Sequence, residues 1–113
     1  MLKNRLAIYI PSKIGQEEIS VERREFFLKK VLADLSRTYG GATAIDGVGA
    51  WLSEVDGLVM ERVTICYTFT DSNDFQPIYR LAAELAAEMR QEAVAVEVNG
   101  GMDFVAAAAV HVA

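Results

Sequence analysis

GGATAIDGVGAWLSEVDGLVMERVTICYTF, residues 40–69, contains two extended runs separated by an Asp-Gly pair at positions 56–57. Asp-Gly between two such runs is a strong short-range signal for a β-hairpin, because both residues tolerate the positive φ angles that tight hairpin turns require. The second run, residues 58–70, alternates its side chains with a period of two over a long distance. The stretch therefore predicts a long hairpin whose second arm is the clearest strand in the chain.

The period of two in the second arm also predicts which side chains face the helices. The more apolar side chains would share one face: Val59, Glu61, Val63, Ile65, Tyr67 and Phe69. The more polar side chains would share the other: Met60, Arg62, Thr64, Cys66, Thr68 and Thr70. We expect the first set to pack against helices and the second set to lie on the open face of the sheet.

The glycines before the turn prompt the question of whether this segment binds phosphate. Phosphate loops follow a strand and precede a helix, whereas the order here is helix, glycines, strand, and no Gly-Lys-Ser/Thr is present. We therefore interpret Gly40 and Gly41 as a helix stop, with the left-handed conformation expected at Gly41. Gly47 and Gly49 would mark a bulge or a close approach of the backbone.

The segments around the hairpin supply two helices and two further strands. Residues 6–10 alternate and end at Pro11, which is typical of a strand, and residues 93–98 (AVAVEV) alternate in the same way. A helix over residues 21–39 would begin after the N-cap Ser20, with an apolar stripe at Phe27, Leu28, Val31, Leu32, Leu35 and Tyr39. A second helix would follow DSND at 71–74, with an apolar stripe at Phe75, Ile78, Leu81, Ala82, Leu85 and Met89.

This order is βαββαβ, and it predicts an α+β, ferredoxin-like sandwich in which two helices cover one face of an antiparallel sheet. We take residues 1–113 as a single domain of that kind. The tail, residues 104–112, is compatible with a fifth strand, a swapped arm or a short helix, because alanines favour helix whereas its Val-His-Val end favours strand. Of the three we expect an extra C-terminal strand.

Composition narrows the function classes. The net charge is −5 and the pI is near 4.8, which opposes binding of nucleic acid, because such binding needs a surplus of Lys and Arg. The apolar run at residues 6–10 is far too short to cross a membrane or to serve as a signal segment. A single cysteine excludes an internal disulfide and is typical of a reducing compartment, so we expect a cytoplasmic protein.

The hairpin resembles a small bacterial family of ferredoxin-like domains that is known only as a domain of unknown function. The residues that carry the resemblance are those of a G-x-T, G-x-W and G-x-x-x-E-R pattern, namely Gly41, Thr43, Gly49, Trp51, Gly57, Glu61 and Arg62. The arrangement of the surrounding helices is similar too, so the likeness spans residues 5–100 in outline, but the N-terminal strand and the alanine-rich tail depart from the pattern. The resemblance implies a fold and no activity.

Few residues offer chemistry. His111 is the only histidine, which excludes a multi-histidine metal site, and we expect no metal and no cofactor. We interpret His111 as an exposed or edge-strand residue rather than a catalytic one. We interpret Cys66 as a small buried hydrophobe rather than a reactive thiolate. We interpret Trp51 as a packing anchor at the hairpin tip, the alternative being a stacking platform for a ligand. Glu61 would point toward the helices and pair with Arg37 or a backbone N–H.

Arg62 is the best candidate for binding a ligand, because an arginine on the open face can hold a carboxylate or another small anion through two hydrogen bonds. The simpler alternative is a cross-strand or intersubunit ion pair, for example with Glu97. The other candidates for ligand contact are Tyr9, Glu61 and Trp51.

These residues are compatible with three classes of function. We expect a non-enzymatic binding module that forms a homodimer, because a half-apolar face with Ala7, Tyr9, Thr64, Cys66 and Thr68 is too large for so small a chain to cover. The alternative is a cofactor-independent enzyme of the dimeric α+β barrel type that acts on a small organic molecule. RNA binding through the sheet is the least favoured, because aromatic residues are missing from the central strand on that predicted face.

Overall fold

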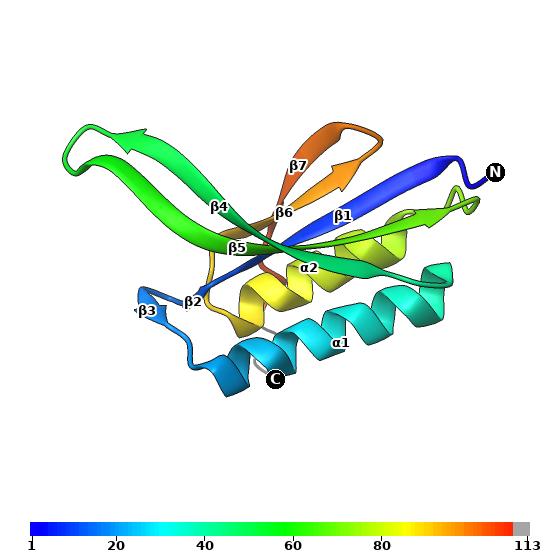
Figure 1. The fold of residues 1–113 in the computed structure, drawn as a ribbon, viewed down its shortest axis with the longest axis horizontal. Helices are drawn as coiled ribbons and strands as arrows, with labels where there is room; N and C mark the ends of the chain where they lie inside the picture. The colour runs from blue at the N-terminus through cyan, green and yellow to red at the C-terminus, as the bar shows by residue number, and fades with distance from the viewer. Residues whose placement is uncertain (110–113) are drawn as a thin grey trace.

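A computed structural model describes residues 1–109, which form two helices, a five-stranded antiparallel sheet and a small two-stranded ribbon. The order of strands in the large sheet is β4 (Thr43–Ser53), β5 (Gly57–Thr70), β1 (Asn4–Pro11), β6 (Ala93–Val98), β7 (Gly101–Ala106). Both helices, α1 (Val21–Tyr39) and α2 (Gln76–Glu88), lie on one side of this sheet (Figure 1). The predicted α+β, ferredoxin-like fold is confirmed.

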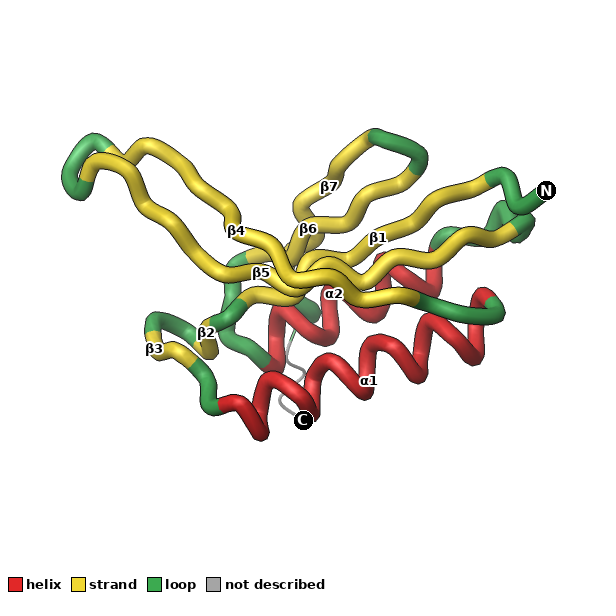
Figure 2. Tube along the Cα trace, in the orientation of Figure 1, coloured by secondary structure: helices red, strands yellow, loops and turns green. Residues whose placement is uncertain are grey.

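The β4–β5 hairpin is the longest feature of the sheet, and its far end runs beyond the helices (Figure 2). The two strands pair without interruption from Thr43 opposite Tyr67 to Ser53 opposite Gly57. Gly57 has a φ of 70°, which accounts for glycine at the end of the turn. The pairing is regular through Gly47 and Gly49, so the predicted bulge is wrong.

The helix ends follow from their capping residues. The Ser20 side chain accepts a hydrogen bond from the Arg23 N–H, and the left-handed residue at the C-terminal end is Gly40, with a φ of 104°. The sequence analysis placed this conformation one residue too late, at Gly41. The second helix begins at Gln76, whose N–H donates to the Asp74 carboxylate, with Pro77 in the first turn.

The core lies between the helices and the near half of the sheet. Its fully buried members come from β1, β5, β6, the two helices and the residue that follows α2: Leu6, Ile8, Ile10, Cys66, Val94, Val96, Phe27, Val31, Leu35, Ile78, Leu85 and Met89. Both predicted helical stripes are confirmed by this burial.

The prediction for the two faces of β5 is wrong. Thr64, Cys66, Thr68 and Thr70 are buried on the helix side, because they stand opposite Ile10, Ile8, Leu6 and Asn4 of β1 in the antiparallel ladder. Residues directly opposite each other in such a ladder share a face. Val63, Ile65, Tyr67 and Phe69 therefore lie on the open face, away from the helices.

The extra C-terminal strand is confirmed as β7, although it begins at Gly101, ahead of the predicted start at Phe104. Asn99 and Gly100, both at positive φ, form the turn from β6. Neither helix of the described residues is long and apolar enough to cross a membrane.

Candidate functional site

The open face of the sheet contains a broad groove of about 760 Å³ where β4, β5, β1, β6 and β7 lie side by side. Its lining is mostly apolar and includes all four residues that the sequence singles out, together with Ile65, Met102 and Phe104; these four are Tyr9, Glu61, Trp51 and Arg62. Trp51 and Phe104 are 50% and 74% exposed, so their ring faces are available for contact. A groove of this size suits a nucleoside or a similar small molecule.

Tyr9 of β1 is held in place by a short polar network at one side of the groove. Its hydroxyl donates a hydrogen bond of 2.8 Å to Oε1 of Glu97 on β6, and Nε of Arg5 donates to Oε2 of the same carboxylate at 3.3 Å. The Arg5 guanidinium in turn lies 4.5 Å from the centre of the Tyr67 ring. These contacts fix the direction of the Tyr9 hydroxyl.

The same surroundings keep Tyr9 protonated. Burial raises the pKa of the Tyr9 hydroxyl above its ordinary value, and the hydrogen bond to the Glu97 carboxylate and its charge add to the rise, while Arg5 opposes it. At neutral pH the tyrosine is therefore a hydrogen-bond donor and a polar edge for a ligand, and it is a poor base.

Glu61 of β5 supplies a carboxylate at the other side of the groove. Its Oε1 lies 3.4 Å from Nζ of Lys13, and its side chain is 38% exposed. The expectation that Glu61 points toward the helices and pairs with Arg37 is wrong, because Glu61 lies on the open face and Arg37 pairs with Asp34. The carboxylate is positioned by one lysine and remains open to a cationic ligand.

Trp51 lies on β4 opposite Val59, two residues from the turn at the far end of the hairpin. It lines the groove with half of its surface exposed, which is more than a packing anchor would show. This position favours the alternative interpretation, a flat apolar surface against which a ligand ring can stack.

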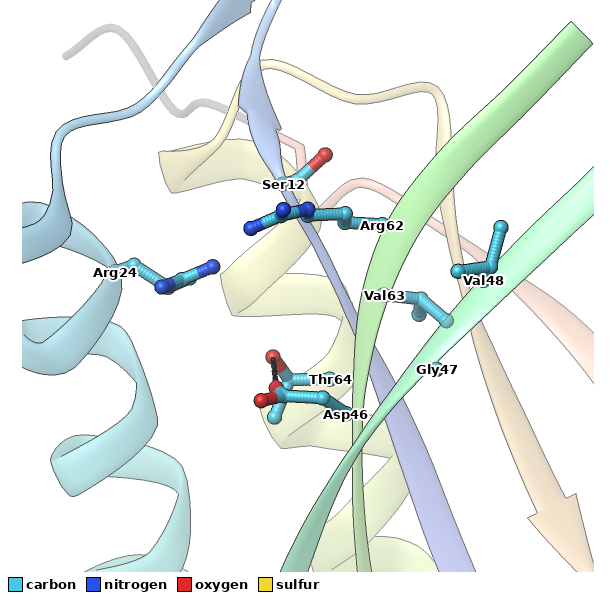
Figure 3. A pocket seen from close by; sticks show the side chains of 8 residues that line it. All are labelled: Ser12, Arg24, Asp46, Gly47, Val48, Arg62, Val63 and Thr64. Carbon is cyan, nitrogen blue, oxygen red and sulfur yellow. Dashed lines mark hydrogen bonds between the residues drawn. The ribbon is translucent and has the colours of Figure 1, made fainter.

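Arg62 is not on the open face. It stands opposite Val48 and shares the helix side of β5 with Thr64, so the predicted pairing with Glu97 is wrong and Glu97 pairs with Arg5 instead. A smaller cavity on that side is lined by both Arg62 and Arg24 (Figure 3). Arg62 also lines the groove beside Tyr9, Glu61 and Trp51, but its guanidinium points away from them, toward Arg24.

The remaining candidates do not contribute to the groove. Cys66 is buried on the helix side, and burial raises the pKa of its thiol to about 12, which agrees with an unreactive core residue. The interpretation of His111 as an exposed or edge-strand residue concerns a position outside the described residues.

Sequence reasoning missed Glu97, Arg5, Lys13 and Phe104 as neighbours of the site. Arg5 and Glu97 are 92 residues apart along the chain and meet only because β1 and β6 are adjacent in the sheet. Their positions on the same face as Tyr9 follow from the alternation of each strand, which the sequence does contain, but their contact depends on the register.

No protein-family model matches the sequence, and no curated protein matches it either. Two solved structures do match, both of a phage SAM lyase. One is the complex with S-methyl-5'-thioadenosine, at 17% identity, with a TM-score of 0.65, covering 92% of this chain and 89% of that chain. The other is the apo state, at 16% identity, with a TM-score of 0.66, covering 96% and 92%.

These matches correct two expectations. The resemblance to a bacterial domain of unknown function is wrong as a relationship, because no family model matches and the structural likeness over nine-tenths of the chain is to the phage protein. The expectation of a non-enzymatic binding module is contradicted as well, because both matching structures are of an enzyme. They favour the alternative, a cofactor-independent enzyme that acts on a small organic molecule.

Proposed function

We propose that this protein is a lyase that binds S-adenosylmethionine on the open face of the sheet and releases S-methyl-5'-thioadenosine. The observation that carries the proposal is the likeness to phage SAM lyase along nearly the whole of both chains, combined with a nucleoside-sized groove on this chain. Because identity is 16–17%, the roles below are argued from the residues of this chain alone.

The groove has the surfaces that an adenosyl sulfonium needs. Trp51 and Phe104 offer exposed aromatic faces for an adenine ring, and stacking of that kind contributes about 1–3 kcal/mol per base. Glu61 offers a negative charge for the sulfonium or the ammonium group of the substrate. The net charge of −5 adds a general attraction for a cationic ligand.

The chemistry suits an apolar groove with few titrating groups. Release of S-methyl-5'-thioadenosine breaks the bond between the sulfonium sulfur and the methionine γ-carbon, and the sulfur keeps both electrons and becomes neutral. Because positive charge disappears along this path, surroundings poorer in water than bulk solvent favour the reaction. No water enters the products of a lyase.

The γ-carbon must gain electrons from elsewhere in the substrate. The substrate's own carboxylate can attack this carbon and close a lactone, or a base can remove a proton from the neighbouring carbon and leave an alkene. The first route needs positioning only, and it fits a groove whose Tyr9 stays protonated and whose Glu61 is already paired with Lys13. Tyr9 and Glu61 then bind and orient the substrate.

The test is direct. Purified protein is incubated with S-adenosylmethionine, and S-methyl-5'-thioadenosine and the four-carbon product are identified by liquid chromatography and mass spectrometry, in the presence and absence of ¹⁸O-water. The proposal expects S-methyl-5'-thioadenosine together with a product that carries no label before any later hydrolysis. Absence of product, with no thermal protection by either nucleoside, would contradict it.

Self-association remains a prediction, with a changed basis. Thr64, Cys66 and Thr68 are buried beneath the helices, so they no longer support it. The exposed apolar side chains at the far end of the hairpin support it instead, and they include Leu52 and Val55 at 80% and 90% exposure. Light scattering at micromolar concentration should give a mass of about twice that of one chain if the homodimer forms.

A further inference from the structure

A second cavity, of about 330 Å³, lies on the helix side of the β4–β5 hairpin, behind the wall of the groove. Arg24 reaches into it from α1 and Arg62 from β5, and the two guanidinium groups point toward one another (Figure 3). Ser12 also lines the cavity. Asp46 and Thr64 lie at the opposite end of the same cavity.

The local structure places both arginines there. Arg24 belongs to the first turn of α1, and its backbone N–H bonds to the carbonyl of the N-cap Ser20. Arg62 shares the helix side of β5 with Thr64. Arg62 is exposed, whereas Arg24 is half-buried, so the cavity is open to small solutes from the hairpin side.

The charges in this cavity are unbalanced. Arg5 and Arg37 have carboxylate partners, whereas neither Arg24 nor Arg62 has one within 4.0 Å among residues 1–109. The nearest acidic group in the lining, Asp46, accepts a hydrogen bond from Thr64 Oγ1 at 3.3 Å at the far end. Two guanidinium groups directed at one space repel each other unless an anion lies between them.

We propose that Arg24 and Arg62 form a binding site for a phosphoryl dianion, either inorganic phosphate or the phosphate of a small phosphomonoester. Two planar guanidinium groups that approach from different elements can each donate two hydrogen bonds to a tetrahedral dianion, whose oxygens point in several directions and whose double charge balances both cations. The volume of about 330 Å³ admits a phosphate or a small sugar phosphate. Asp46 confines the anion to the arginine end.

This cavity adjoins the proposed substrate groove, with which it shares the lining residues Gly47, Val48, Arg62 and Val63, but the Arg62 guanidinium points toward Arg24 on the helix side (Figure 3). Successive residues of a strand point to opposite faces, so Glu61 faces the groove while Arg62 faces the second cavity. The proposal therefore does not rest on the lyase activity, and S-methyl-5'-thioadenosine should not displace phosphate.

Calorimetric titration with inorganic phosphate, at constant ionic strength kept with sodium chloride, tests the site. We expect saturable binding that Arg24→Gln and Arg62→Gln each weaken by about tenfold or more, since each removes a charged fork. The matched control is Arg37→Gln, which removes the same charge from an exposed arginine already paired with Asp34 and should leave binding within about twofold. Asp46→Asn should tighten binding, because it removes the one negative charge of the lining.

The same titrations also test whether each variant is folded and whether the site binds free phosphate or a phosphomonoester. Arg62→Lys keeps the charge and loses the fork, so its affinity should fall between wild type and Arg62→Gln, and circular dichroism confirms that each variant is folded. Ribose 5-phosphate in place of inorganic phosphate distinguishes a phosphomonoester site, which binds it more tightly, from a site for the free ion.

Four results would overturn the proposal. The first is a phosphate response no larger than that of chloride. The second is equal weakening by Arg37→Gln, and the third is competition by S-methyl-5'-thioadenosine. A change of oligomeric state in Arg62→Gln without phosphate binding in wild type would assign the arginines to contacts between copies of the chain, which also contradicts it.

Discussion

The two ends of β5 belong to one continuous strand and differ in what covers them. At the near end the helix-side residues Thr64 and Cys66 are 6% and 0% exposed, whereas at the far end Leu58 and Met60, on the same side, are 61% and 63% exposed. The strand alternates in the same way throughout, so the difference comes from where the helices end. The covered end stabilises the fold, and the uncovered end leaves both faces of the hairpin open to ligands.

The largest expected effect is a difference in the free energy of unfolding between substitutions at the two ends of the β5 region. Ile8→Ala removes a fully buried side chain opposite Cys66 and should lower the free energy of unfolding by about 2–5 kcal/mol. Leu58→Ala, at the uncovered end, should change it by less than about 0.5 kcal/mol. Urea unfolding followed by circular dichroism measures both. If Leu58→Ala costs as much as Ile8→Ala, something covers the far end, and a dependence on protein concentration would identify a second copy of the chain.

The next prediction concerns the groove face of the uncovered end. Glu61→Gln keeps the shape of the side chain and removes the charge that attracts the cationic substrate, so it should lower kcat/KM for release of S-methyl-5'-thioadenosine by about a hundredfold, which corresponds to about 2.7 kcal/mol. Glu54→Gln, in the exposed turn of the same hairpin, is the matched control and should leave the rate unchanged. Equal rates for Glu61→Gln and wild type would remove Glu61 from the site.

The covered end should also respond to alkaline pH through Cys66. Its thiol has a pKa of about 12 in the folded protein, against 9.0 for a free thiol, so between these values the unfolded chain binds fewer protons than the folded one. The free energy of unfolding therefore falls as pH rises, by about 1.4 kcal/mol per pH unit from this group. Cys66→Ala should have a shallower decline in urea unfolding between pH 9 and 10. An unchanged slope would mean that the thiol is not protected.

The fold could be predicted because its elements are signalled locally. The Ser20 cap, the Asp56-Gly57 pair and the two helical stripes each depend on a few neighbouring residues, and all of them are present in the structure. The left-handed Gly40 and the start of β7 were missed by one and three residues, which is the usual uncertainty at the ends of elements.

The faces of β5 could not be predicted from its own pattern. The apolar set that includes Ile65 and Tyr67 is the more hydrophobic one, and it nevertheless lies on the open face. Threonines can be buried because their hydroxyls find local partners: Thr68 donates to the carbonyl of Gly41, and Thr70 accepts from the Ser72 N–H. A slip of one residue in register inverts every side chain of a strand, and here β1 sets that register.

Only part of the candidate site could be predicted, again because the faces of β5 depend on its register with β1. Tyr9 belongs to β1, whose faces were assigned correctly, and Glu61 and Trp51 join it on the open face only once β5 is inverted. The same inversion of the β5 faces places the Arg62 side chain on the helix side of the sheet. The residues that orient Tyr9, Arg5 and Glu97, depend on pairing between β1 and β6, which local patterns do not contain.

The smallest expected effect concerns Gly40, the residue at which α1 ends and the chain turns toward β4. Gly40 has a φ of 104°, where a Cβ is strained, so Gly40→Ala should lower the free energy of unfolding by about 1 kcal/mol although no atom lies within 4 Å of the added carbon. Gly41→Ala is the matched control, because Gly41 has no positive φ and has equally open space. It should be neutral or slightly stabilising, since alanine reduces the conformational freedom of the unfolded chain. Urea unfolding of the two variants side by side measures the difference, and a greater loss in Gly41→Ala would return the left-handed position to the residue that the sequence analysis chose.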